Sequence, residues 1–187
     1  MGLRNWIYRN YKYRVFPRVK HIRGATRLKQ ILDRLTLIEV EKYDDEPTGI
    51  ADLEWNNLIV LDGCRHDLYE EVNGPTEKRV TLGSNTKEFL KKNFSDGDWS
   101  DVVYVTANPH LAPHLFEDIT GRDVEETFKE VYHAYMDRWS DEHNTVLPED
   151  LVDAAEEAIE DHPDARLIVH FMQPHYPFID GETTMEG

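Results

Sequence analysis

Polar side chains follow three apolar runs of the sequence, at the points where predicted strands end. Asp62 ends the run NLIVLD, Asn108 follows DVVYVTA, and His175 lies shortly after RLIVHFM. A fourth polar residue, Thr86, begins a predicted helix. In open parallel sheets, ligands bind in the crevice beyond the carboxyl ends of the strands. We therefore expect these four side chains around one crevice, where Asn108 and His175 would contact a bound substrate.

Asp62 has the residue type and the setting of a ligand for a divalent metal ion. A strand fixes the carboxylate, and Gly63 lets the chain turn away from it. The alternative is that Asp62 caps the helix that follows. Arg65 and His66 come next in the sequence and add a candidate anion contact and a candidate hydrogen-bond donor behind the metal ligand.

Two hydroxyl groups, those of Ser84 and Thr86, lie in the turn Gly83–Thr86 before a predicted helix. A hydroxyl exposed at a helix start can act as a nucleophile when a metal ion favours its deprotonation. The free N–H groups of the helix start would also stabilise an anion such as phosphate or sulfate. A helix start capped by Ser or Thr is the alternative. Thr86, taken as the helix cap, is the first candidate for a nucleophile and Ser84 the second.

The histidines differ in the chemistry that their surroundings suggest. His175 lies between two prolines in the segment QPHYPF, and rigid loops at strand ends commonly carry function. His170 lies inside a strand pattern and is expected in the core. His110 and His114 are four residues apart, but a proline between them argues against one helix that presents both to a metal ion. These two are expected to be loop residues.

Alternating strand and helix patterns must position these side chains. Apolar runs and helical periodicity predict strands at 57–62, 101–107 and 166–172 and helices at 65–73, 86–94, 123–139 and 148–162. This alternation is typical of βαβ units, so the predicted class is α/β with a mostly parallel central sheet flanked by helices.

Charge is distributed unevenly along the 187 residues. The net charge is -16, but residues 1–42 hold 11 Lys and Arg against 3 Asp and Glu, while residues 43–187 hold 10 against 34. An acidic body of this kind repels nucleic acid, so a nucleic-acid partner is not expected. The same density of acidic groups is typical of proteins from a high-salt cytoplasm, which predicts a halophilic protein. An ordinary acidic protein is the alternative.

Residues 1–50 are predicted to form a basic helical extension, and residues 51–187 the main domain. Within residues 1–23, basic and aromatic side chains alternate, a pattern that could contact anionic lipid at a membrane surface or RNA. Packing of these aromatic side chains on the acidic body explains the same pattern. Apolar residues at helical spacing predict an amphipathic helix over residues 25–42.

Several protein classes are excluded by what the sequence lacks. It contains no GxGxxG, P-loop, GxSxG or HExxH motif, so dinucleotide, P-loop, α/β-hydrolase and zincin functions have no support. Cys64 is the single cysteine, which excludes a disulfide within the chain. There is neither an apolar run long enough to span a membrane nor the apolar region of a signal peptide, so a cytoplasmic location is expected.

Four segments together resemble the sulfatase-like proteins of haloarchaea in the alkaline phosphatase superfamily: NLIVLDGCRHDLYEEV, GSNTKEFLKKNF, VVYVTANPH and LIVHFMQPHYPFID. The resemblance spans residues 55–181 in motif order. It implies that Asp62 binds a divalent metal ion and that Thr86, or in second place Ser84, attacks phosphorus or sulfur. It also implies that His175 contacts the substrate, a phosphate or sulfate ester of a small molecule or glycan.

Two departures from the family pattern shape the expected activity. Cys64 lacks the Cys-x-Pro-x-Arg context in which true sulfatases make formylglycine, so a hydroxyl nucleophile and phosphoester chemistry are favoured. The family takes further metal ligands from an Asp-His-Gly segment and a later histidine, both downstream of the Pro-His loop, and the sequence ends at Gly187 before them. We therefore expect a fold incomplete at its C-terminus and little or no esterase activity from this chain alone. The alternative is a non-catalytic truncated protein or pseudoenzyme that binds an anion or a protein partner.

Overall fold

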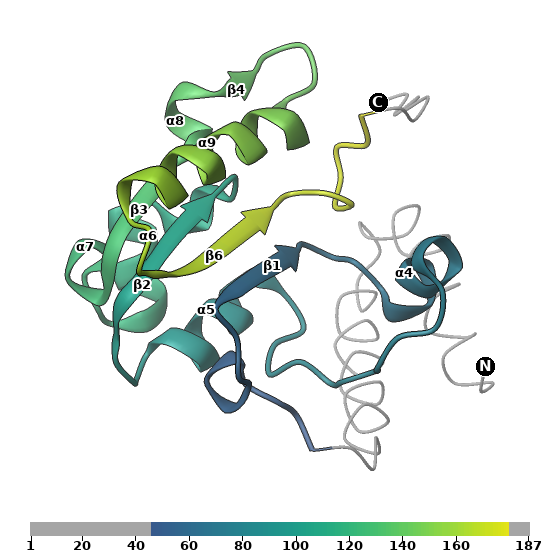
Figure 1. Ribbon diagram of the computed structural model, residues 1–187, viewed down its shortest axis with the longest axis horizontal. Coiled ribbons are helices and arrows are strands. Elements are labelled where there is room, and N and C mark those ends of the chain that lie inside the picture. Colours follow the sequence, from purple (N-terminus) through teal and green to yellow (C-terminus); the bar gives the residue numbers. More distant parts are fainter. Residues whose placement is uncertain (1–45, 180–187) are drawn as a thin grey trace, which may run out of the picture. The chain divides into compact units, whose positions relative to one another are not determined.

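The computed structural model describes residues 46–179 (Figure 1). The chain divides after Glu46, and the described residues belong almost wholly to the unit that begins at Pro47. The predicted basic arm, the amphipathic helix over 25–42 and the C-terminal residues 180–187 lie outside the described residues. No helix in the described part is long and apolar enough to cross a membrane.

Four parallel strands form the central sheet. They are β1 (Asn57–Leu61), β2 (Trp99–Thr106), β3 (Phe128–His133) and β6 (Arg166–Phe171). Their spatial order is β1-β6-β2-β3, and every neighbouring pair is parallel. The carboxyl ends of all four strands therefore lie at the same edge. A separate antiparallel pair is made by β4 (Trp139–Ser140) and β5 (Thr145–Val146). The predicted α/β class with a mostly parallel sheet is confirmed.

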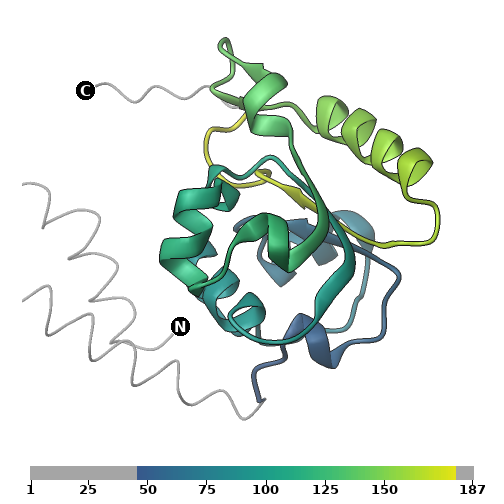
Figure 2. The same cartoon turned by 90° about the vertical axis from the view of Figure 1, so that its left-hand side faces the viewer.

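Helices connect and cover the strands. They are α4 (His66–Asn73), α5 (Thr86–Phe94), α6 (Pro113–Thr120), α7 (Val124–Thr127), α8 (Ala134–Asp137) and α9 (Pro148–Asp161), with 3-10 turns η2 (Ile50–Asp52) and η3 (Pro109–Leu111). Figure 2 shows the yellow-green α9 and the teal helices separated by the strands. The fold is thus a sheet between two helical layers.

The core consists of two apolar clusters, one on each face of the sheet. Successive side chains of a strand point to opposite faces, so Val102 and Tyr104 of β2 join one cluster, while Val103 and Val105 join the other. The first cluster includes residues of α5, α6 and α7, and the second is covered mainly by α9. Because both faces are covered, β2 reads as a nearly continuous apolar run.

The predicted long helix over 123–139 is wrong. The segment forms the short helix α7, the strand β3 and the short helix α8. Phe128 and Val131 fit helical spacing, but the run FKEVYH is also rich in the aromatic and β-branched residues that strands favour. Pairing of β3 with β2 satisfies the backbone groups of this run, and Phe128 is buried in the first cluster. Tertiary pairing therefore outweighed the helical periodicity.

Candidate functional site

A pocket of about 540 Å³ opens at the carboxyl edge of the sheet. Its wall is made by the end of β1 with the turn after it, the turn before α5, and the end of β6 with the loop after it. Asp62, Thr86 and His175 all line it, together with Ser84, Cys64 and the buried His170. The structure thus brings the predicted metal ligand, both predicted nucleophiles and one predicted substrate contact to one pocket. Asn108 contacts Asp62 from outside this lining.

The carboxylate of Asp62 is held by two side chains from different elements. Its Oδ2 atom accepts a hydrogen bond from the Thr86 hydroxyl at 3.0 Å and another from the Asn108 amide at 2.8 Å. The backbone N–H of Asp62 donates to the carbonyl of Phe171 at 3.1 Å, which continues the ladder between β1 and β6 by one residue. These contacts join the ends of β1 and β2 to the start of α5. Asp62 is therefore a side chain with a fixed orientation.

The turn after Asp62 requires a glycine. Gly63 has a φ of +70°, a conformation that residues with a side chain rarely adopt. An added Cβ atom would meet the ring of His175 at 3.4 Å, an ordinary van der Waals contact, so the backbone conformation is what favours glycine here. The His175 ring is held by its Nδ1 atom, which donates to the carbonyl of Tyr176 at 2.6 Å, and its backbone N–H donates to the carbonyl of Met172. The predicted sharp turn is present, and it lies beside His175 in the loop after β6.

The turn before α5 separates the two candidate nucleophiles. The N-cap is Asn85, whose side chain accepts from the N–H of Glu88 at 3.0 Å, so the predicted cap at Thr86 is wrong by one residue. Asn is one of the preferred N-cap residues, because its side-chain oxygen satisfies a free N–H of the first turn. The backbone N–H and the hydroxyl of Ser84 donate to the Glu88 carboxylate at 3.1 Å and 2.8 Å, and these hydrogen bonds, the backbone one first, lower the pKa of Glu88. Thr86 is thus the hydroxyl directed at Asp62, whereas Ser84 takes part in the helix start.

Gly83 sets the position of this turn. A Cβ atom at residue 83 would lie 2.3 Å from the backbone nitrogen of Phe89, a distance that no real side chain tolerates. The chain can therefore pass this close to the first turn of α5 only with glycine. Because of this close approach, Ser84 and Thr86 lie at the pocket.

His170, which was expected in the core, lines the pocket and forms a buried polar pair with Tyr104. His170 is 1% exposed, and its Nδ1 atom lies 2.9 Å from the hydroxyl of Tyr104. Burial lowers the pKa of His170 to about 4, although the nearby Asp62 opposes this shift. Burial also raises the pKa of Tyr104. Both groups are therefore neutral at neutral pH.

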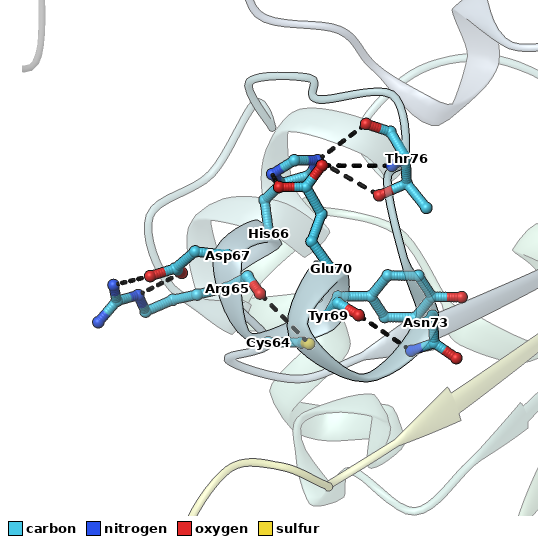
Figure 3. A network of polar contacts seen from close by, with 8 residues as sticks. All are labelled: Cys64, Arg65, His66, Asp67, Tyr69, Glu70, Asn73 and Thr76. Carbon is cyan, nitrogen blue, oxygen red and sulfur yellow. Dashed lines mark hydrogen bonds and ion pairs between the residues drawn. The ribbon is translucent and has the colours of Figure 1, made fainter.

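Arg65 does not line the pocket. Its guanidinium pairs with Asp67, which lowers the pKa of that carboxyl group, and both side chains are exposed (Figure 3). His66 likewise turns away: its Nε2 atom contacts Thr76 at 3.2 Å, and its Nδ1 atom lies 3.5 Å from Glu70. These contacts tie α4 to the loop after it. In this structure, neither residue lies where the predicted anion contact or metal-supporting contact would need it.

His110 is the site residue that sequence reasoning missed. It was expected to be a loop histidine, but its Nδ1 atom lies 2.9 Å from the side-chain oxygen of Asn108 and so joins the Asp62 network. Its pKa is lowered, first by partial burial and then by the charge of Lys87, with Asp62 acting in the opposite direction. The segment Asn-Pro-His, which follows a buried strand, was the sequence feature that could have indicated a site residue here.

The fit of this site to a divalent metal ion is partial. Within residues 46–179, no group of three or more His, Cys, Asp or Glu side chains is arranged to hold a metal ion. Asp62 and the Thr86 hydroxyl are candidate oxygen ligands that contact each other in the pocket, and Oδ2 of Asp62 already accepts two hydrogen bonds. Divalent ions such as Mg²⁺ and Ca²⁺ take about six or more oxygen ligands in total.

The fold and the pocket define an α/β protein with a polar site at the carboxyl edge of a parallel sheet. No protein-family profile, curated protein or solved structure matches the chain.

Proposed function

We propose that this pocket is the substrate site of a sulfatase-like hydrolase that acts on phosphate or sulfate esters, with Thr86 as the nucleophile. The observation that carries the proposal is the hydrogen bond of 3.0 Å from the Thr86 hydroxyl to the Asp62 carboxylate inside the pocket. A hydroxyl that donates to a carboxylate is oriented, and the carboxylate is placed to accept its proton as the oxygen bonds to phosphorus or sulfur and the bond to the alcohol or phenol oxygen of the ester breaks. The alkaline phosphatase superfamily, to which the sequence motifs point, uses a nucleophile at such a helix start.

The start of α5 supports an anionic substrate. Thr86 is the first residue of this nine-residue helix. The N–H groups of the first helical turn and the positive end of the helix dipole stabilise negative charge that develops beside the hydroxyl. His175 at the rim adds a side chain that can contact an ester oxygen. The substrate class is a phosphate or sulfate ester of a small molecule or glycan.

The Asp62 carboxylate opposes an anionic substrate unless its charge is compensated. A divalent metal ion held by Asp62 and Thr86 would supply that compensation and would favour the deprotonated form of the hydroxyl. With these two ligands from the described residues, we expect the 187-residue chain to bind the metal weakly and to turn over substrate slowly or not at all. Substrate binding and turnover are therefore measured separately.

An assay with aryl phosphate, aryl phosphodiester and aryl sulfate in molar KCl, with Mg²⁺, Mn²⁺ or Zn²⁺ added, tests the role of Thr86. We expect any turnover to fall at least about 100-fold in Thr86→Val and Asp62→Asn, because the nucleophile or its proton acceptor is removed. Ser84→Ala is the matched control and should keep most of the activity, since its hydroxyl is engaged by Glu88.

The outcomes of this assay separate three cases. Turnover that survives in Thr86→Val but is lost in Ser84→Ala would assign the nucleophile to Ser84. Robust metal-dependent turnover that disappears in both Thr86→Val and Asp62→Asn would show that the chain is catalytically complete. Binding of phosphate without turnover of any substrate would fit the non-catalytic alternative.

A further inference from the structure

The side chain of Asn108 lies between two functional groups of the site. It is 1% exposed, and its backbone N–H donates to the Thr106 hydroxyl at 2.9 Å. A buried amide is costly unless both its N–H₂ group and its oxygen are hydrogen-bonded. Here the amide nitrogen contacts Asp62 at 2.8 Å, and the amide oxygen contacts His110. Each end of the amide therefore has a specific partner.

The chemistry of these partners fixes the orientation of the amide. An ionised carboxylate only accepts hydrogen bonds, so the group of Asn108 that faces Asp62 must be the N–H₂ group. The opposite orientation would bring two oxygens together. The amide oxygen then faces His110, where it also accepts from the backbone N–H of that residue at 3.0 Å. The orientation follows from two independent contacts.

The same chemistry fixes the proton on the imidazole ring of His110. The Nδ1 atom lies 2.9 Å from an amide oxygen that can only accept, so Nδ1 must carry the hydrogen. In the neutral ring, Nε2 then carries the lone pair. The lowered pKa of His110, caused first by partial burial, favours this neutral form. Two other histidines contact carboxylates through Nε2: His133 at 3.3 Å from Glu125, and His162 at 2.8 Å from Glu130. These rings should carry the hydrogen on Nε2.

We propose that Asn108 is a positioning residue, which orients the Asp62 carboxylate toward Thr86 and holds His110 in the tautomer with its hydrogen on Nδ1. One series of hydrogen bonds joins four side chains. Thr86 and Asn108 both donate to the Oδ2 atom of Asp62, and the amide oxygen of Asn108 accepts from His110. His110 is not part of the pocket lining and is connected to it through this series. The tautomer follows from the structure alone, whereas its consequence for ester hydrolysis rests on the proposed function.

The test is two-dimensional ¹⁵N NMR of the histidine rings in the ¹⁵N-labelled full chain, in molar KCl at about pH 8, where an ordinary histidine is neutral. Loss of one set of signals in His110→Gln assigns the ring. We expect His110 to show a protonated Nδ1 atom and an unprotonated Nε2 atom, and His133 and His162 to show the opposite pattern in the same spectrum. A wild-type His110 ring with its hydrogen on Nε2 would overturn the proposal.

Two variants of Asn108 separate its two contacts. Asn108→Leu removes both the donor and the acceptor, so His110 should lose its single tautomer while His133 keeps its own. Asn108→Asp retains an acceptor for His110 but loses the donor to Asp62, so the tautomer should persist. An unchanged His110 ring in Asn108→Leu would contradict the proposal, and so would loss of the tautomer in a folded Asn108→Asp. If Asn108→Leu does not fold, the wild-type spectrum and Asn108→Asp still decide.

Activity gives a separate readout. If the chain proves active, we expect Asn108→Asp to lower kcat by about 10- to 100-fold, in the range found for residues that orient a functional group through hydrogen bonds. The tautomer result does not depend on turnover. A confirmed tautomer without phosphate binding or hydrolysis would leave the positioning role standing and remove the proposed function.

Discussion

Replacement of Phe94 by alanine should lower the free energy of unfolding by about 3–5 kcal/mol, the usual range for a buried phenylalanine. Phe94 is 0% exposed at the end of α5. Its ring makes edge-to-face contacts with Trp99 at 4.9 Å and Phe128 at 5.2 Å between centroids, and with Tyr104 at 5.7 Å. The substitution would remove a ring that joins α5 to β2 and β3. Because Thr86 begins the same helix, the pocket should loosen as well.

Urea denaturation followed by circular dichroism in molar KCl measures this effect. Phe178→Ala is the matched control, because it makes the same chemical change at a ring that is 54% exposed. We expect the control to change the free energy of unfolding by no more than about 0.5 kcal/mol, as is usual for surface positions. Equal effects in the two variants would contradict the burial of Phe94 in the first apolar cluster.

The second large effect is a requirement for salt. Residues 43–187 hold 34 Asp and Glu against 10 Lys and Arg. The helix α9 contains no Lys or Arg, and its acidic residues are Glu149, Asp150, Asp153, Glu156, Glu157, Glu160 and Asp161. Like charges three or four residues apart on a helix destabilise it. Salt reduces the Debye length from about 10 Å at 0.1 M to about 3 Å at 1 M, which screens this repulsion. We therefore expect cooperative thermal unfolding in molar KCl and loss of most native circular dichroism near 0.1 M.

Charge reversal on α9 tests the cause of the salt requirement. The variant Glu160→Lys replaces an exposed acidic group with a partner for Glu156, four residues earlier on the same helix, so the midpoint of the salt-dependent transition should move to lower KCl. The charge-conserving variant Glu160→Asp is the control and should leave the midpoint nearly unchanged. Full native structure of the wild-type chain in low salt would contradict the expectation.

The sequence predicted the strands that carry the site because their signals are local. The runs NLIVL, VVYVT and RLIVHF are mostly apolar, which is the pattern of parallel strands. Strands β2 and β6 are largely buried, whereas β1 lies at the edge of the sheet with Ile59 65% exposed. Once the strands are known, the parallel topology places residues such as Asp62 and Asn108 at one edge. This is why a crevice lined by Asp62, Thr86 and His175 could be expected before the structure was known.

What the sequence could not provide depends on the geometry of contacts, both between distant strands and within local turns. The strand β3 was hidden by helical periodicity, which its pairing with β2 outweighs in the folded chain. The hydrogen-bond partners of Arg65 and His110 could not be read from the sequence either. Arg65 pairs with Asp67 at the surface. His110 lies in the 3-10 turn η3, where its ring contacts the side chain of Asn108. Residue types suggested candidates, but hydrogen-bond geometry decided which of them share a site.

The most direct test of the central claim is a titration of the ¹⁵N-labelled chain with inorganic phosphate in molar KCl, with and without Mg²⁺, followed by backbone amide NMR. We predict saturable shifts at Gly63, Thr86 and Asn108, with a Kd in the range of about 1–10 mM, or roughly -3 to -4 kcal/mol. Thr86→Val should weaken them and Ser84→Ala should not. The same titration with sulfate separates the two ester classes. No saturable change at these amides, or the same change in Thr86→Val and Asp62→Asn as in the wild-type chain, would contradict the assignment of this pocket as an oxyanion ester site.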